Sequence, residues 1–224
     1  MKVKDIPFIG PILSSLSSKL YRRSYFKNSG EYWEKRYKDG GNSGSGSYNQ
    51  LAIFKAEILN QFVEKNKISS VVELGCGDAN QLKLQKYPNY IGYDVSNTIL
   101  DSCSKTFFED NTKQFDHISN FKSKKTDLIL SLDVIYHLIE DDVYYNHMKT
   151  LFNANNNNVI IYSSNFDDDY GNKEIKHVRH RRFTNWVEKN AKDFKLDKLI
   201  KNKYPYSGDS KTGSLADFYF YSHR

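Results

Sequence analysis

The sequence predicts an α/β fold in which a mostly parallel β-sheet is covered by helices on both faces. Short apolar segments of strand length alternate with polar segments that can hold helices, and this alternation is typical of parallel sheets. A glycine-containing turn directly follows the first of these apolar segments, as it does in nucleotide-binding α/β domains. The C-terminal segments indicate a closing antiparallel hairpin.

The composition is that of one folded domain. The chain has 224 residues, of which 38% are hydrophobic and 15% aromatic, enough for one sizeable core. Its 2 cysteines form neither a CxxC pair nor a Cys/His cluster, so a disulfide framework and a structural zinc site are both unsupported. We therefore expect a reducing, cytoplasmic location. The net charge of +6 suits an anionic partner but does not select nucleic acid, lipid or a phosphorylated small molecule.

Residues 1–29 are expected to form an N-terminal extension to a domain that spans residues 30–224. The apolar run in this extension is too short for a signal peptide or a membrane-spanning helix. Its leucines Leu13, Leu16 and Leu20 recur at helical spacing. This pattern fits a helix packed on its own domain or an amphipathic helix in peripheral contact with a membrane.

The remaining elements follow from apolar runs and their spacing. A helix over residues 51–62 leads into the first strand. Parallel strands are expected over residues 71–74, 90–93, 106–108, 128–132 and 159–163. A helix over residues 183–194 then precedes the hairpin strands, which are expected over residues 195–200 and 216–221.

The turn after the first strand has the sequence ELGCGDA, residues 73–79. Its glycines let the backbone turn tightly against a ligand. The second strand ends in Asp94, 21 residues beyond Glu73, near the offset at which a carboxylate bonds ribose hydroxyls. Together these features predict a site for NAD or S-adenosylmethionine. Glu73 would crowd a pyrophosphate and suits a cationic ligand, which favours S-adenosylmethionine.

In these motifs the chain resembles the class I S-adenosylmethionine-dependent methyltransferases, over roughly residues 32–221. The resemblance implies a Rossmann-like, mostly parallel seven-stranded sheet with one antiparallel strand, and S-adenosylmethionine as cofactor. It implies that Glu73, Gly75 and Gly77 line the methionine half of the cofactor and that Asp94 binds the ribose. The other implied cofactor contacts are Val95, Leu132 and, near the adenine after the third strand, Asp110 and Asn111. A dinucleotide-dependent dehydrogenase is the alternative for this turn.

Residues 40–48, GGNSGSGSY, follow an aromatic and cationic segment at residues 32–37. A phosphate-binding P-loop would need a preceding strand and a Gly-Lys-Ser/Thr ending, and both are missing. Two interpretations are left, a plain solvent loop and a lid with glycine hinges. The resemblance favours a lid over residues 30–48. Its expected cofactor contacts are Trp33, Arg36 and Tyr37, and its expected acceptor contacts are Ser43 and Tyr48.

The predicted catalytic residues follow the fourth strand. Asp133, Tyr136 and His137 stand at its carboxyl end, where ligands bind in open α/β sheets. His137 is either a general base for a hydroxyl or a structural histidine. The segment lacks the Pro-Pro-aromatic sequence of base-amine methyltransferases, which argues against adenine or cytosine amines as acceptors.

The basic segment KHVRHRRF, residues 176–183, is the predicted anion site. Arginine suits bidentate capture of a phosphate or carboxylate. The alternative is a solvated basic face paired with the acidic residues 167–169. The expected acceptor contacts are His177, Arg179, His180 and Arg181. Because no standard ligand spacing occurs, no metal is predicted.

The sequence therefore predicts a methyltransferase that acts on an oxygen of a small anionic acceptor, either phosphorylated or nucleotide-linked. Its motifs together are similar to those of methyltransferases from bacterial surface-polysaccharide clusters, including enzymes that methylate capsule precursors such as phosphoramidates. Two alternatives are open. One is an RNA methyltransferase, which the charge suits although no appended RNA-binding module is visible. The other is a non-catalytic, cofactor-binding subunit of a heteromeric complex.

Overall fold

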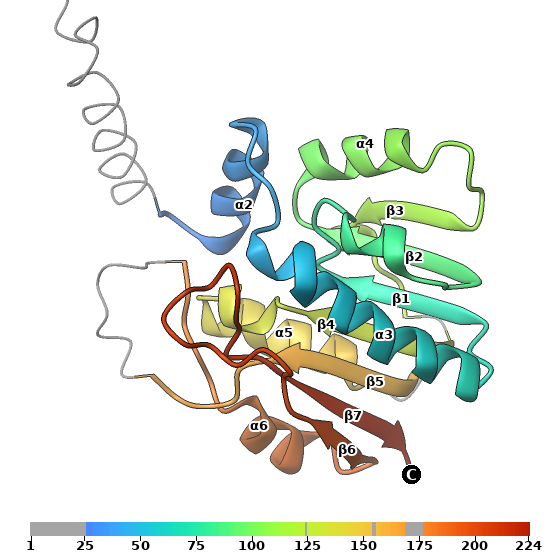
Figure 1. Cartoon of the computed structure of the whole chain (residues 1–224). Coiled ribbons are helices and arrows are strands. Elements are labelled where there is room, and N and C mark those ends of the chain that lie inside the picture. Colours follow the sequence, from blue (N-terminus) through green and yellow to red (C-terminus); the bar gives the residue numbers. More distant parts are fainter. Residues whose placement is uncertain (1–25, 124, 154–155, 169–176) are drawn as a thin grey trace, which may run out of the picture.

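The chain folds around a seven-stranded sheet with the strand order β3-β2-β1-β4-β5-β7-β6 (Figure 1). The computed structural model describes residues 26–123, 125–153, 156–168 and 177–224. All neighbouring strands pair in parallel except β7, which is antiparallel to both β5 and β6. The predicted sheet, mostly parallel with one antiparallel strand, is confirmed. The N-terminal leucines and Lys176 lie outside the described residues.

The elements keep the alternating order that the sequence predicts. The strands are β1 (Ser70–Leu74), β2 (Asn89–Asp94), β3 (Lys113–His117), β4 (Thr126–Leu132), β5 (Asn156–Ser163), β6 (Phe194–Ile200) and β7 (Asp217–His223). The helices are α2 (Ser29–Lys38), α3 (Asn49–Lys65), α4 (Asn97–Thr106), α5 (Asp141–Leu151) and α6 (Phe183–Asn190). Short 3-10 turns at Gln81–Leu84 and Ile135–His137 follow β1 and β4.

The third strand was predicted at the wrong place. Residues 106–108 form the end of α4 and the turn after it, and the Phe108 side chain is 85% exposed. The true β3 is an edge strand whose residues are only partly buried, so it carries little of the apolar pattern by which strands are found. As a consequence, Asp110 and Asn111 precede β3 and lie at the amino edge of the sheet. The predicted adenine contacts would have required the opposite edge.

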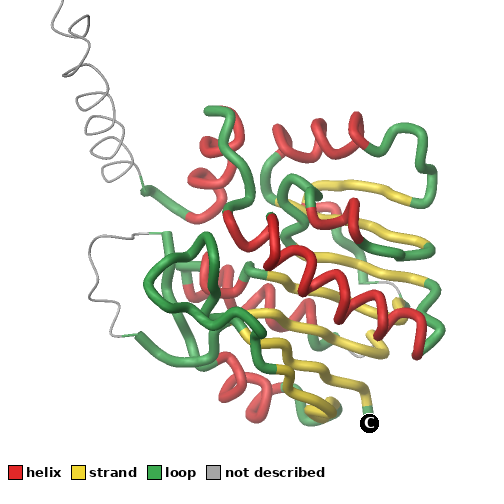
Figure 2. Tube along the Cα trace, viewed as in Figure 1, coloured by secondary structure: helices red, strands yellow, loops and turns green. Residues whose placement is uncertain are grey.

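Helices cover both faces of the sheet (Figures 1 and 2). Along β4 the buried side chains alternate: Leu130 packs in the cluster formed with α3 and α4, whereas Ile129 packs in the cluster formed with α5 and α6. Phe54 of α3 and Met148 of α5 are representative partners on the two sides. The two-residue period of the strand thus separates two cores, as expected for a sheet buried on both faces.

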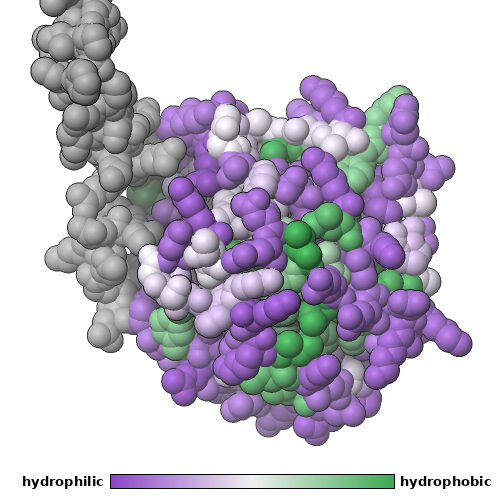
Figure 3. Space-filling model, in the orientation of Figure 1, coloured by the Kyte–Doolittle hydropathy of each residue, from purple (hydrophilic) through white to green (hydrophobic). Residues whose placement is uncertain are grey.

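The face of the described residues seen in Figure 3 is largely hydrophilic. One band of hydrophobic residues crosses the face seen in Figure 3. Large exposed hydrophobic side chains include Ile53 of α3 and Leu215 before β7. In the described part of the chain, no helix combines the length and the apolar character that crossing a bilayer requires.

Candidate active site

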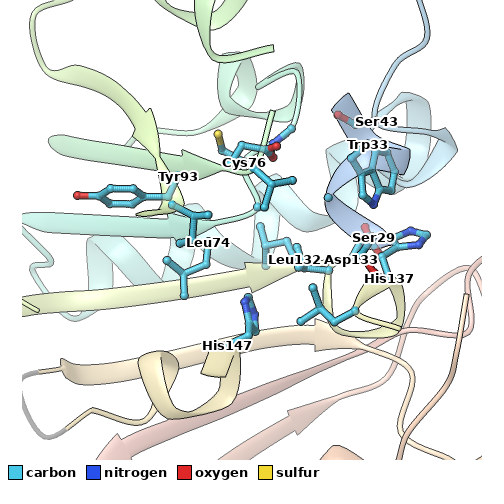
Figure 4. A pocket seen from close by; sticks show the side chains of 18 of the residues that line it. Ser29, Trp33, Ser43, Leu74, Cys76, Tyr93, Leu132, Asp133, His137 and His147 are labelled. Atoms are coloured by element: carbon cyan, nitrogen blue, oxygen red, sulfur yellow. The ribbon is translucent and has the colours of Figure 1, made fainter. Parts of the chain in front are cut away.

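A cavity of about 430 Å³ opens at the carboxyl ends of β1, β2 and β4 (Figure 4). Its size lies within the range of small-molecule sites. Trp33 and His137 stand at one end of the view, and Tyr93 stands at the other. The cavity brings together many residues that the sequence singled out, namely Trp33, Tyr37, Ser43, Gly75, Gly77, Asp94, Val95, Leu132, Asp133 and His137.

The glycine turn after β1 needs its glycines. Gly75 and Gly77 have φ values of 84° and 55°, in the left-handed region that side chains disfavour. A Cβ at Gly75 would lie 2.5 Å from the Val134 side chain, and a Cβ at Gly77 would overlap Ser43 Oγ. The turn is also fastened to β2, because the N–H groups of Gly75 and Cys76 both donate to the Tyr93 carbonyl. Its backbone therefore forms a fixed wall of the cavity.

Asp94 ends β2 beside this turn. Its Oδ2 accepts a hydrogen bond from the Gly77 N–H and its Oδ1 accepts one from the Ser96 N–H, each over 3.0 Å. Burial raises the pKa of Asp94, while these two N–H groups act to lower it. Each carboxylate oxygen has further acceptor capacity toward the cavity that it lines.

Glu73, unlike the glycines with which it was predicted to contact the methionine half of a cofactor, is not among the described residues that line the cavity. Its side chain lies behind the turn, where it accepts hydrogen bonds from the Tyr90 hydroxyl (2.7 Å) and the Gln81 amide (3.2 Å). Side chains alternate along β1, so Leu74 reaches the cavity whereas Glu73 faces the opposite layer. Burial raises the pKa of Glu73 to about 7.

Helix α2 crosses the cavity and is fastened at both ends. At its start, the N–H and Oγ of Ser29 donate to the Glu140 carboxylate over 2.9 and 2.6 Å. Toward its other end, Glu34 accepts hydrogen bonds from the hydroxyls of Ser96 (2.5 Å) and Thr98 (2.9 Å) at the start of α4. These contacts hold the Trp33 side chain against the cavity.

The loop at residues 40–48 packs on the glycine turn. Ser43 Oγ lies 3.0 Å from the Tyr37 hydroxyl, and a Cβ at Gly46 would lie 2.7 Å from Asp133 Oδ2. Tyr48, predicted to contact the acceptor, instead donates its hydroxyl to Asp78 over 2.7 Å. Two of the predicted contacts therefore serve to hold the loop: Tyr48 does so through Asp78, and Arg36 does so by donating to the Asn42 carbonyl over 2.6 Å.

Asp133 and Tyr136 form a bonded pair at the end of β4. The Tyr136 hydroxyl donates to Asp133 Oδ1 over 2.7 Å, and the buried Lys55 ammonium lies 2.6 Å from Oδ2. Asp133 lines the cavity, whereas Tyr136 is not among its lining residues. Burial raises the pKa of Tyr136 well above its usual range. Both carboxylate oxygens of Asp133 are engaged, so this side chain is better suited to orienting its neighbours than to accepting a proton.

His137 lines the cavity with one ring nitrogen bonded and the other without a partner among the described residues. Its Nδ1 lies 2.9 Å from the His177 carbonyl oxygen, which can only accept, so we assign the proton to Nδ1 and the lone pair to Nε2. Among the described residues Nε2 has no hydrogen-bond partner, and the ring lines the cavity edge-on to Trp33 at 4.9 Å. Burial lowers the pKa of His137 to about 4, so the imidazole is neutral at pH 7.

The basic segment takes a different place from the one predicted. Arg181 is only 9% exposed, and its guanidinium donates to the carbonyls of Leu138 and Ile139 and pairs with Asp141 at 2.9 Å. Arg179 bonds Ile139 and Asp141 as well. These arginines therefore tie the segment to the loop before α5. None of the four acceptor contacts predicted in this segment is among the described residues that line the cavity.

The two histidines of this segment also make packing contacts. His177 stacks on Tyr32 with a ring separation of 4.4 Å. His180 Nδ1 is hydrogen-bonded to Ser164 Oγ over 2.6 Å, and the His180 ring stacks on Phe166. The segment thus supports the rim of the site through its backbone and rings.

Sequence reasoning missed several polar side chains in and around the site, among them His147, which lines the cavity, and Lys55, which contacts Asp133. His147 of α5 lines the cavity, with Nε2 2.9 Å from Ser131 Oγ, and burial lowers its pKa to about 4. Its position, three residues after the buried Tyr144 and one before the buried Met148, is the signal that could have placed it on the inner face of a helix. Lys55 offers no such signal, because a lysine is normally expected on the solvent side.

Among the described residues, no group of three or more His, Cys, Asp or Glu side chains is arranged to hold a metal ion.

No protein-family model matches the sequence, and no curated protein matches it. Solved structures do share its fold. One is the N-methyltransferase NodS from Bradyrhizobium japonicum WM9 in complex with S-adenosyl-L-homocysteine, with a TM-score of 0.67 over 88% of this chain and 99% of that one, at 12% identity. The chain has the Rossmann-like methyltransferase fold.

Two further structures with the methyltransferase fold are similar. The magnesium protoporphyrin IX methyltransferase ChlM from Synechocystis PCC 6803, with bound S-adenosylmethionine, has a TM-score of 0.58 over 92% of this chain and 97% of that one, at 14% identity. The methyltransferase domain of bacterial CtHen1 has a TM-score of 0.59 over 78% of this chain and 99% of that one, at 20% identity.

Proposed function

We propose that the chain is an S-adenosylmethionine-dependent methyltransferase. The observation that carries this proposal is that one cavity joins the glycine turn and Asp94, which suit a nucleoside ligand, to a neutral histidine whose free nitrogen suits proton removal. The NodS and ChlM structures hold the two adenosyl ligands that such a cavity would take, S-adenosylhomocysteine and S-adenosylmethionine.

The residues of the cavity fit this cofactor. The left-handed Gly75 and Gly77 leave their backbone open to close approach, and the Asp94 carboxylate would accept hydrogen bonds from the ribose hydroxyls. Apolar walls that would flank the adenine are formed by Leu132, Ile118 and Phe121. When bound, S-adenosylmethionine supplies a methyl group activated by its sulfonium.

The chain's own residues would orient the acceptor and remove its proton. A neutral hydroxyl must lose its proton when its oxygen is methylated, and Nε2 of His137 is the acceptor that the site offers. The fixed backbone of the turn and the ring of Trp33 limit where the acceptor oxygen can lie, and such positioning supplies much of the rate in a displacement reaction. Helix α2 and the loop at residues 40–48 form the proposed lid, which would exclude water.

For the acceptor, we propose an oxygen of a small anionic molecule. The net charge of +6 supports an anionic class, and Arg179 keeps 30% of its side chain exposed near the rim. Arg181 contributes little to this hypothesis, because its donors already bind carbonyls and Asp141. The finer hypothesis of a phosphorylated or nucleotide-linked capsule precursor rests on the motif resemblance.

A second candidate function is RNA methylation. The net charge of +6 favours it. The structure of the small RNA methyltransferase HEN1 is also similar, with a TM-score of 0.58 at 17% identity, although the match covers only 26% of the HEN1 chain. This candidate would be supported by binding to a short RNA whose association constant falls steeply with salt, with a slope of several units in a plot of log K against log salt concentration.

The test is a calorimetric titration of the purified chain with S-adenosylmethionine and S-adenosylhomocysteine, with NAD as the control ligand. Saturable binding of the adenosyl ligands alone supports the proposal, and loss of that binding in Asp94→Ala supports the site. Binding of NAD, or of none of the three, contradicts it. Cofactor binding without turnover on phosphorylated, nucleotide-linked and RNA acceptors would favour the non-catalytic subunit.

A further inference from the structure

Lys55 is a buried cation in the middle of α3. Its side chain has no exposed surface and lies on the helix face that also carries the buried Leu51, Ala52 and Leu59. The ammonium lies 2.6 Å from Asp133 Oδ2 and 5.2 Å from the centre of the Tyr162 ring. A leucine or methionine would satisfy the pattern of this face, so packing alone does not account for a charged residue.

A buried ion pair is a weak source of stability, because the loss of hydration offsets most of the attraction between the charges. Such pairs are better explained by what they hold in place. Here the partner is unusual, since Asp133 adopts a φ of 60°, a left-handed conformation that non-glycine residues seldom take. Lys55 therefore pairs with Asp133, the first residue after β4, and stabilises it in this left-handed conformation.

The contacts continue from Asp133 to the base. Its other oxygen, Oδ1, accepts the Tyr136 hydroxyl over 2.7 Å, which closes the turn at Ile135–His137. Within that turn the His137 N–H donates to the Val134 carbonyl over 2.8 Å. One carboxylate therefore connects a helix on one face of the sheet to the short turn that presents the imidazole.

We propose that Lys55 is a positioning residue of the methyl-transfer site, which holds Asp133 and through it the turn that presents His137, and which balances the carboxylate charge beside the imidazole. This inference rests on the proposed function only in giving His137 the role of base. The contacts themselves are independent of any ligand.

The charge balance makes a distinct prediction for His137. Burial lowers the pKa of His137 most. The His177 carbonyl and Asp133 act to raise this pKa, whereas Arg36 on α2 and His180 act to lower it. Removing the Lys55 charge leaves the Asp133 carboxylate without its partner. The pKa of His137 should then rise, because the imidazolium gains a nearby uncompensated anion.

The test is NMR of the imidazole resonances in the ligand-free full-length protein, with the His137 signals identified by their absence in His137→Gln. In Lys55→Met we expect the His137 pKa to rise by about 0.5–1 unit. We also expect its nitrogen shifts at pH 7 to move from the Nδ1–H form toward a mixture of tautomers. In Lys55→Arg, which keeps the charge, the pKa should stay within 0.2 unit of the wild type.

The matched control is Lys65→Met, which removes an exposed charge from the last turn of the same helix and should leave His137 unchanged. If Lys55→Met fails to fold, Lys55→Gln takes its place. Because the amide keeps a hydrogen-bond donor, Lys55→Gln should raise the pKa and preserve the tautomer. An unchanged His137 pKa in a folded Lys55→Met or Lys55→Gln protein overturns the inference.

Failure of this inference is distinguishable from failure of the proposed function. The NMR readout uses neither cofactor nor acceptor, whereas the proposed function is tested by titrating the wild type with S-adenosylmethionine. Wild-type binding combined with an unchanged His137 in the Lys55 variants contradicts only the inference. A shifted His137 in a chain that binds no adenosyl ligand contradicts only the proposed function.

Discussion

Ser43 and Asp78 bond to each other twice. The N–H of Ser43 donates to Asp78 Oδ2 over 2.9 Å, and the N–H of Asp78 donates to Ser43 Oγ over 2.8 Å. Tyr48 donates to the same carboxylate oxygen, so Asp78 binds the loop at residues 40–48 both near its start and at its end. A loop of glycine and serine, which alone would be a flexible connector, is thereby fixed on the turn that follows β1.

Asp78→Ala should release this loop. The change removes the acceptor of both loop hydrogen bonds, from Ser43 and Tyr48, and of a third from the Asn80 N–H, each contributing about 1.5–3 kcal/mol because one partner is charged. If the loop is the lid that we propose, the affinity for S-adenosylmethionine should fall about tenfold, and amide hydrogen exchange at residues 40–48 should accelerate. Asp101→Ala, an exposed change on α4, is the control. Unchanged affinity with accelerated exchange would show that the loop is a plain connector.

Gly77→Ala should weaken cofactor binding at the turn. The alanine would have to adopt the left-handed backbone conformation of Gly77, which side chains disfavour. Its Cβ would also overlap Ser43 Oγ, so the turn or the loop at residues 40–48 must move. Gly208→Ala is a matched control, because Gly208 also has a positive φ but nothing lies within 4 Å of an added Cβ. Calorimetry should show at least a tenfold loss of affinity for Gly77→Ala alone. Equal affinity in the two variants would remove the turn from the site.

The part of the site that the sequence predicts well depends on the backbone and its periodicity. A strand that runs into a glycine turn, and a second strand that ends in an acid, place Gly75, Gly77 and Asp94 at one edge of a parallel sheet whatever the surroundings. The fourth strand delivers Asp133 and His137 to the same edge for the same reason. These positions follow from chain direction alone.

The errors arise where side-chain partners decide the outcome. Glu73 and Leu74 are adjacent, and only the pleat of β1 determines which of them reaches the cavity. Arg181 looks like a free anion ligand in the sequence, but its guanidinium is occupied by two carbonyls and by Asp141, 40 residues away. Lys55 and Asp133 are 78 residues apart in the sequence, so the ion pair between them cannot be predicted from either position.

Acid should destabilise the fold through two partly buried histidines. The pKa of both His137 and His147 is lowered to about 4 in the folded chain, below the ordinary value of 6.5. Between pH 6.5 and 4 the unfolded chain therefore binds more protons, so the free energy of unfolding falls as the pH falls through this window. Each histidine contributes a slope of up to about 1.4 kcal/mol per pH unit.

His147→Gln should flatten this dependence. The glutamine amide can keep a hydrogen bond to Ser131 but does not titrate, so denaturant unfolding measured at pH 7, 5.5 and 4.5 should show a smaller loss of stability than the wild type. The exposed His223→Gln is the control and should follow the wild-type curve. A His147→Gln curve parallel to the wild type would mean that His147 is not held neutral by burial.

Arg181→Met should reduce stability and leave cofactor affinity unchanged. Arg181 is buried beside Tyr144, and its loss leaves the Leu138 carbonyl without this donor and removes one partner of Asp141. We expect the free energy of unfolding to fall by about 2–4 kcal/mol, because buried polar groups lose their partner. Arg179→Met, at a more exposed position, should cost under about 1 kcal/mol.

The same pair of variants separates the two interpretations of the basic segment. If the segment packs as the contacts indicate, Arg181→Met acts on stability, and only Arg179→Met raises the Michaelis constant of an anionic acceptor. If Arg181→Met instead keeps its stability and raises that constant, the guanidinium must leave Asp141 when the acceptor binds. Arg181 would then bind the anion, as predicted from the sequence, and Asp141 would be its partner only in the absence of the acceptor.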